Sequence, residues 1–172
     1  MSVHKLDARF GMVPAHSRLL SDRSATLTLP EMKQLRAQLR LFHKKFPQSL
    51  LSVFVTELPA NANVREYAFW MANRARFTAA DRVRSENFNL LFVIDIAHGG
   101  AALTTGYGLE NYVPESALQR ALDDFAAAAQ ADGLAPGISA CIESLVRQLR
   151  ELATQAKGQA ELEGAARGSE TW

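Results

Sequence analysis

At 172 residues, with 48% apolar and 22% charged residues, the chain has the composition of a soluble globular protein and is long enough to bury one hydrophobic core. Nineteen basic and eighteen acidic residues give a formal net charge of +1, which excludes the strong positive field typical of nucleic-acid-binding proteins. Cys141 is the one cysteine and the four histidines are scattered, so neither an internal disulfide nor a zinc site is expected.

The N-terminal part of the sequence bears on where the chain works. Its first residues lack the continuous apolar core of a signal peptide, and no segment approaches the run of about 18 apolar residues that crosses a bilayer. The chain as written is therefore expected to be soluble and cytoplasmic, without a transmembrane segment. Residues 1–24 mix glycine, proline, serine and aspartate without a period, which predicts an irregular segment.

Regular structure is predicted to begin with a helix after Thr28. Thr28 and Glu31 match a capping box, in which a hydroxyl and a carboxylate satisfy free amide groups of the first turn. Apolar residues then recur at helical spacing as far as Pro47. Residues 50–56 are rich in branched and aromatic side chains, which predicts a buried strand. Asn63, followed by Glu66, starts the next helix by the same capping logic.

The second half of the chain predicts a strand hairpin followed by two helices. Residues 90–96 form an apolar strand, and the turn at residues 98–100 leads into a short strand at residues 101–105. Pro114 suits the first turn of a helix, which ends at the glycine of residues 132–133. A last helix is predicted from apolar residues at helical spacing, namely Ile138, Ile142, Leu145, Leu149 and Leu152.

The order of these elements predicts a single domain of the α/β class, a three-layer α/β/α sandwich with a small central sheet flanked by helices. The domain is expected to cover residues 25–155, after the irregular segment at residues 1–24. From residue 156 the sequence is small, polar and charged, with almost no large apolar side chain. Residues 156–172 are therefore predicted to form a flexible C-terminal tail.

Two motifs invite enzymatic interpretations that their context disfavours. Gly106 and Gly108 lie between a strand and a helix, as in a dinucleotide fingerprint, but Asn111 stands where the third glycine belongs. Backbone freedom at the turn is favoured, and no nucleotide is expected. Cys141 and Arg147 have the spacing of the cysteine phosphatases, but no glycine separates them and the segment continues an apolar helical stripe. Cys141 is therefore predicted to be an inert buried thiol.

Hard oxygen donors lie near the ends of the predicted strands. Glu86 and Asn87 precede the second strand, Asp95 lies near its end, and Glu110 follows the third. Calcium and similar cations take several such oxygens from flexible segments, so a composite site is chemically possible. The alternative is that these residues are solvent-exposed helix caps and turn residues without a ligand. Asp95 fits this alternative least, because an unpaired carboxylate in an apolar run costs free energy. Four arginines lie near the same connection, namely Arg74, Arg76, Arg82 and Arg84. They could bind an anion, but exposed side chains at the end of a helix are the favoured interpretation.

Several short motifs give the chain a family resemblance. From about residue 24 to residue 152 it resembles the TPM-domain family, which includes the thylakoid lumen acid phosphatase and many bacterial relatives. The most specific motif is Gly-Tyr-Gly-Leu-Glu before a helix. The segments that carry the resemblance, in order, are residues 55–59, 66–68, 86–88, 90–93 and 106–110. Asp132 also resembles the acidic position of a Gly-Asp-Tyr motif in the family.

The resemblance implies a compact α/β/α sandwich and leaves the function open. Some relatives resemble calcium-binding proteins with weak acid-phosphatase activity, and others act as accessory or assembly factors tethered to membranes. Two departures weaken the implied cation site. Phe88 stands where the family has the glycine that opens a loop, and the paired acids after the second strand are reduced to Asp95 and the following turn. The usual export signal and membrane helix are also missing.

The sequence therefore predicts a TPM-like binding or accessory module with an unknown protein partner. A weakened site for Ca²⁺ or another divalent cation would use Glu86, Asn87, Asp95 and Glu110. Two alternatives stay open. One is a metal-assisted phosphomonoester hydrolase of the acid-phosphatase type, in which the cation polarises the phosphate and a bound water attacks it. The other is a metal-free protein-interaction domain.

Overall fold

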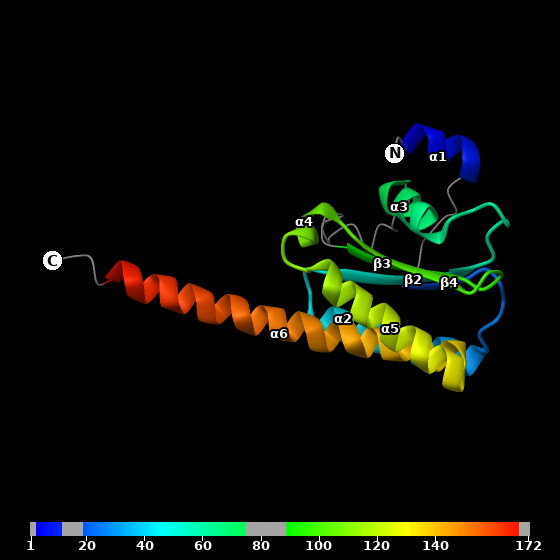
Figure 1. Ribbon diagram of the computed structural model, residues 1–172. Helices are drawn as coiled ribbons and strands as arrows, with labels where there is room; N and C mark the ends of the chain where they lie inside the picture. Colours follow the sequence, from blue (N-terminus) through cyan, green and yellow to red (C-terminus); the bar gives the residue numbers. More distant parts are fainter. Residues whose placement is uncertain (1–2, 12–18, 75–88, 169–172) are drawn as a thin grey trace.

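A four-stranded sheet lies between two layers of helices, and one helix extends far beyond the rest (Figure 1). The structure, a computed structural model, describes residues 3–11, 19–74 and 89–168. The elements in chain order are α1 (Val3–Phe10), β1 (Leu20–Asp22), α2 (Leu29–Lys45), β2 (Leu50–Thr56), α3 (Val64–Arg74), β3 (Asn89–Asp95), β4 (Gly100–Thr105), α4 (Tyr107–Glu110), α5 (Glu115–Asp132) and α6 (Leu134–Gly168).

The sheet has the strand order β1-β2-β3-β4. The first three strands run parallel, and β4 is antiparallel to β3. Every residue of β2 and β3 is buried, as expected for strands that helices cover on both faces. β4 lies at one edge of the sheet, and most of its residues are only half-buried. The open side of this edge strand is the starting point for the site described below.

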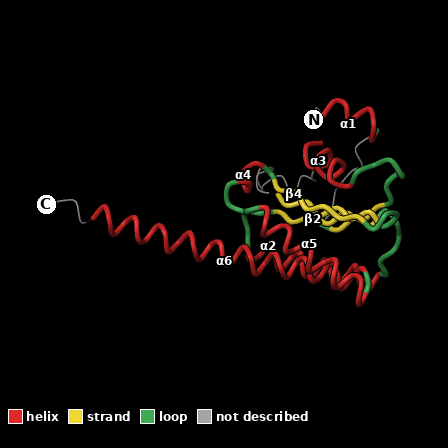
Figure 2. The backbone as a smooth tube through the Cα atoms, in the orientation of Figure 1, coloured by secondary structure: helices red, strands yellow, loops and turns green. Residues whose placement is uncertain are grey.

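Helices cover both faces of the sheet (Figure 2), and each face has its own hydrophobic cluster. α1 and α3 cover one face, where Trp70 and Phe54 are buried. α2, α5 and α6 cover the other face, where Phe92 packs edge-on against Phe125. Because successive strand residues point to opposite faces, Leu91 and Phe92 enter different clusters. The predicted α/β/α sandwich is confirmed.

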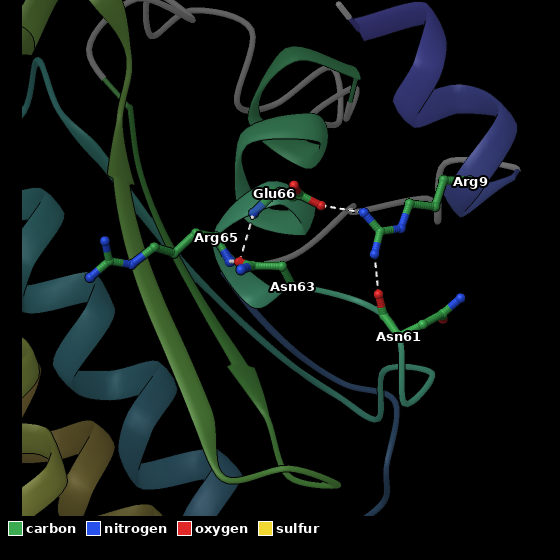
Figure 3. Close-up of polar contacts among 5 residues, drawn as sticks. All are labelled: Arg9, Asn61, Asn63, Arg65 and Glu66. Carbon is green, nitrogen blue, oxygen red and sulfur yellow. Dashed lines mark hydrogen bonds and ion pairs between the residues drawn. The ribbon is translucent and has the colours of Figure 1, made fainter. Parts of the chain in front are cut away.

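Two helices begin as their capping residues predict. The Thr28 hydroxyl accepts a hydrogen bond from the Glu31 N–H, and the Glu31 carboxylate accepts one from the Thr28 N–H. At the start of α3, the Asn63 side chain accepts hydrogen bonds from the N–H groups of Arg65 and Glu66 (Figure 3). These side chains satisfy amide groups that a helix leaves without an internal partner.

The predicted strand boundaries agree with the structure to within one residue. β2 has the predicted bounds, β3 begins and ends one residue earlier than expected, and β4 begins at Gly100. Gly99 has a φ of +65°, which explains the glycine in this tight turn. Pro114 is the cap residue before α5 instead of a member of its first turn.

The N-terminal segment differs from the prediction of an irregular region, because it contains α1 and β1. Leu6 of α1 is buried, and Asp7 accepts a hydrogen bond from the indole N–H of Trp70 at 2.9 Å. Arg9 forms an ion pair with Glu66 on α3 (Figure 3). β1 is too short to show a period in the sequence, whereas Val3, Leu6 and Phe10 of α1 recur at helical spacing. Contacts with distant residues hold both elements in place.

The last helix is also longer than predicted. α6 continues to Gly168 and leaves the globular part as a single extended helix (Figure 1). It therefore includes most of the segment for which the sequence predicts a flexible tail. Residues 153–160 are all exposed, so the described packing of this helix ends near Leu152. The flexibility of the tail stays a prediction. None of the described helices is long and apolar enough to cross a membrane.

Candidate binding site at the edge of the sheet

The β3–β4 hairpin places two of the predicted cation ligands at opposite ends of the sheet. Asp95, the last residue of β3, pairs with Gly100 of β4 beside the tight turn. Glu110 ends α4, which follows Thr105 at the other end of β4. Five residue steps of about 3.4 Å put roughly 17 Å of strand between these ends. A single cation, which contacts its ligands at about 2.3–2.6 Å, does not reach both carboxylates.

The other two predicted ligands, Glu86 and Asn87, lie outside the described residues. Within residues 3–11, 19–74 and 89–168, no three histidine, cysteine, aspartate or glutamate side chains gather closely enough to hold a metal ion. The structure thus separates Asp95 from Glu110 and leaves the rest of the set undescribed. The cation site as a whole stays a prediction.

Asp95 has a full set of hydrogen-bond donors inside the protein. Its side chain is only 3% exposed. The carboxylate accepts hydrogen bonds from the Leu58 N–H at 3.0 Å and the Ala97 N–H at 3.1 Å, and it contacts the His98 Nδ1 at 2.8 Å. Leu58 follows β2, so Asp95 joins the end of β2 to the turn after β3. These contacts satisfy a buried charge that would otherwise cost several kcal/mol, on the order of 3 or more.

The same contacts explain the acidity of this group. Burial by itself raises the pKa of Asp95, because it disfavours the charged form. The hydrogen bonds from Leu58, His98 and Ala97, together with the charge of His98, outweigh burial and hold the pKa of Asp95 below its ordinary value. Asp95 is therefore an ionised structural group, and its oxygens are already occupied by protein donors.

A groove of about 410 Å³ runs along the outer side of β4. Half-buried and buried apolar side chains from β4 and from α5 form part of its lining, among them Leu103, Leu118 and Leu122. Charged side chains also line it, and no ion pair to a described residue is found for any of them. They are Arg65 from α3, Glu110 from α4 and Glu115 from α5.

The orientation of Arg65 depends on the start of α3. Asn63 caps the backbone there, and the neighbouring Glu66 points toward Arg9 of α1 (Figure 3). The Arg65 side chain points the opposite way, away from α1. Two consecutive residues of one helical turn thus have different roles. Glu66 binds Arg9 of α1, and Arg65 lines the groove.

A smaller hollow of about 190 Å³ continues the groove past the end of β4. It shares Thr104, Thr105 and Glu110 with the larger groove. Two large aromatic side chains of this region are exposed, Tyr107 at 67% and Tyr112 at 69%. Such exposure of large side chains, near charges that pair with no described residue, is a feature of surfaces that bind other molecules.

The backbone of β4 is also available on this side. Within the described residues β4 pairs with β3 alone. The Gly106 N–H donates to the Asn89 carbonyl at 2.8 Å. Antiparallel pairs alternate between hydrogen-bonded and non-hydrogen-bonded, so Thr104 and Ala102 direct their amide groups at β3. The N–H and C=O groups of the intervening residues, Ala101, Leu103 and Thr105, then point away from β3, and Leu103 and Thr105 line the groove.

Two other candidates of the sequence analysis have structural roles. Cys141 is buried on α6, and burial, followed by the negative charge of Asp124, raises the pKa of its thiol well above the ordinary value. The prediction that this thiol is buried is confirmed, and its inertness stays a prediction. Of the four arginines considered for an anion site, Arg74 binds Asp7 of α1, and the other three lie outside the described residues.

Sequence reasoning missed most of the groove. Leu118 and Leu122 fit the inner stripe of a predicted helix, yet both are half-buried and reach the groove. Arg65 carries no motif, and only the packing of α3 against the sheet reveals its position. The short length and half-polar composition of residues 101–105 are the one signal that favours an edge strand.

Comparison with known proteins gives a family and a fold. A family model described as the TPM domain matches residues 20–148, most of the chain. A comparison with curated proteins finds no match. Similar solved structures are found.

The solution NMR structure of the N-terminal domain of a protein from P. gingivalis aligns with a TM-score of 0.59 and 22% identity, over 78% of this chain and 86% of that one. The NMR structure of the BA42 protein from the psychrophilic bacterium Bizionia argentinensis aligns with a TM-score of 0.60 and 14% identity, over 76% of this chain and 86% of that one. At these identities the likeness shows the fold alone.

Proposed function

The chain belongs to the TPM-domain family, and from that premise we propose that it acts as a binding or accessory module for another protein, with the groove beside β4 as its working surface. The state of the charged side chains carries the proposal. Arg65, Glu110 and Glu115 line the groove without an ion pair to any described residue, whereas Asp95 at the other end of the sheet is fully engaged. Charges that pair with no described residue, placed around an apolar strip, match the polar rim and apolar centre of protein interfaces.

The apolar strip supports a protein partner over a small polar ligand. Leu103, Leu118 and Leu122 keep part of their surface in contact with solvent. Covering the exposed part of each side chain contributes on the order of 1 kcal/mol, half the value for full burial of a leucine. Contributions of this size from three residues suit the reversible binding of a protein segment.

A divalent cation fits this proposal only at the Glu110 end. Glu110 is exposed and its side chain accepts no hydrogen bond from a described residue, while the Asp95 oxygens accept from three groups. The rival function, a metal-assisted phosphomonoester hydrolase, needs a cation that polarises a phosphate and binds a water. Within the described residues its only predicted acid with free oxygens is Glu110, and one carboxylate does not make such a site.

A displayed library of random peptide segments tests the proposal. Segments should be enriched on the wild-type protein and lost on a double variant of the groove, Arg65→Glu with Glu110→Lys. The matched control is Arg40→Glu with Glu151→Lys, which reverses one exposed charge of each sign on α2 and α6, away from β4. Failure to enrich any segment, or equal enrichment on wild type and the groove variant, would overturn the proposed function.

A further inference from the structure

We infer that the groove binds an extended protein segment that adds to β4 as a fifth, antiparallel strand, with a basic residue beside Glu110 and an acidic residue beside Arg65. The inference rests on the proposed function and gives its partner a conformation and a charge pattern. Its first basis is the outer edge of β4, where Ala101, Leu103 and Thr105 direct backbone groups away from β3, and Leu103 and Thr105 line the groove. An added strand would satisfy these groups with main-chain hydrogen bonds.

The helices beside β4 favour a single strand over a second copy of this chain. α3 and α5 pack against β4 on opposite faces of the sheet (Figure 1), and both contribute side chains to the groove. A second copy paired through β4 would bring its own α3 and α5 to the same edge, and those helices would have to fit beside the first pair. A segment without flanking helices has no such requirement, and it is the occupant that we assign to the groove.

The charges of the groove set the order of the charged residues along an antiparallel strand. Arg65 lies in the first turn of α3, whose start packs beside Gly100, while Glu110 follows the Thr105 end of β4. A segment that begins with a basic residue at the Thr105 end and finishes with an acidic residue at the Gly100 end runs antiparallel to β4. Opposite charges then face each other at both ends.

The side chains of the segment follow from the same geometry. Leu103 packs with the cluster on the α5 side of the sheet, and residues directly opposite in an antiparallel pair point to the same face. Apolar residues of the segment therefore lie opposite Ala101, Leu103 and Thr105, on the side of Leu118 and Leu122. Polar residues alternate with them and point toward α3.

A capped seven-residue peptide serves as the probe: lysine first, glutamate last, and valine alternating with threonine between them, beginning and ending with valine. Amide hydrogen exchange with and without the peptide is measured on the full chain. We expect slower exchange at Ala101, Leu103 and Thr105, with little change at Ala102 and Thr104, whose amides already face β3. No binding at millimolar peptide, or slower exchange confined to other elements, would overturn the inference.

Methylated peptides sharpen this test. The valine N–H groups should donate to β4, so methyl groups on the valine nitrogens should abolish binding. Methyl groups on the threonine nitrogens face solvent and should leave binding within about twofold. Equal effects of the two patterns would show that the peptide binds without adding a strand.

Reversing the charges tests the charge order assigned to the antiparallel strand. A peptide with glutamate first and lysine last should bind the wild type about threefold to tenfold more weakly, the range expected for two exposed ion pairs. The double variant Arg65→Glu with Glu110→Lys should prefer the reversed peptide, and the Arg40→Glu with Glu151→Lys control should behave as wild type. An unchanged preference would contradict the assigned charge pattern.

The outcomes separate this inference from the proposed function. Displayed segments that depend on Arg65 and Glu110, but leave the exchange of Ala101, Leu103 and Thr105 unchanged, would keep the binding module and overturn strand addition. A concentration-dependent dimer that slows exchange at these three amides without any peptide would instead assign the edge to a second copy of the chain.

Discussion

The two ends of the β3–β4 hairpin use acidic side chains in opposite ways. At the turn, Asp95 is buried and accepts hydrogen bonds from Leu58 and Ala97, with His98 at 2.8 Å. At the other end, Glu110 is exposed in a groove and pairs with no described residue. Residue type alone therefore does not identify a site. The residues packed around a carboxylate decide whether its oxygens remain free to bind a ligand.

The largest expected effect is on the free energy of unfolding, from a substitution of the buried Asp95. Asp95→Ala removes three interactions and leaves buried donors without an acceptor, which should lower the free energy of unfolding by about 3 kcal/mol. For a chain of this size the melting temperature should fall by about 6–12 °C. Glu110→Ala, measured alongside by thermal or urea unfolding, should stay within about 0.5 kcal/mol of wild type. Similar losses in the two variants would erase the distinction between the ends.

The pH dependence of unfolding gives a second, smaller effect. Because the folded-state pKa of Asp95 lies below its value in the unfolded chain, its stabilisation is complete above the unfolded pKa of about 3.9. It is lost as the pH falls through the folded pKa. Wild type should therefore lose more stability than Asp95→Asn when unfolding is followed from pH 6 down to pH 3. Parallel curves for the two proteins would show that Asp95 does not carry this contribution.

Calcium distinguishes the ends by a different property. If a cation raises the melting temperature, Glu110→Gln should remove that rise and Asp95→Asn should leave its size unchanged, because the Asp95 oxygens are occupied by protein donors. The rise is measured for each variant against its own metal-free melting temperature. Loss of the rise in both variants would require one ion to reach across roughly 17 Å of strand, contrary to the fold. No rise in the wild type at 10 mM calcium would remove the cation from the account.

The elements that the sequence predicts well are those with strong local signals. Continuous apolar runs indicate β2 and β3 to within a residue, and the Thr28–Glu31 capping box marks the start of α2. The Gly-Tyr-Gly-Leu-Glu motif at residues 106–110 carries a family resemblance that the match over residues 20–148 confirms. Local chemistry is sufficient in these places because the interacting residues are neighbours in the chain.

The features that sequence reasoning missed depend on distant contacts. Asp95 is explained by the Leu58 N–H, 37 residues away, and α1 is held by Trp70, 63 residues from its partner Asp7. Arg65 acquires its position only when α3 packs beside β4. Pairings of this kind follow from the fold as a whole. The positions of acidic residues in the sequence therefore do not show which of them lines a groove and which is buried in a turn.

The most direct test of these opposite roles measures affinity and melting temperature on the same two variants. A peptide enriched on the groove is titrated against Glu110→Gln and Asp95→Asn, at a temperature where both remain folded. We expect Glu110→Gln to bind the peptide about threefold more weakly, because it loses one exposed ion pair, and to have the melting temperature of the wild type. We expect Asp95→Asn to melt earlier and to bind with unchanged affinity. Weaker binding by Asp95→Asn with full affinity in Glu110→Gln would contradict these opposite roles.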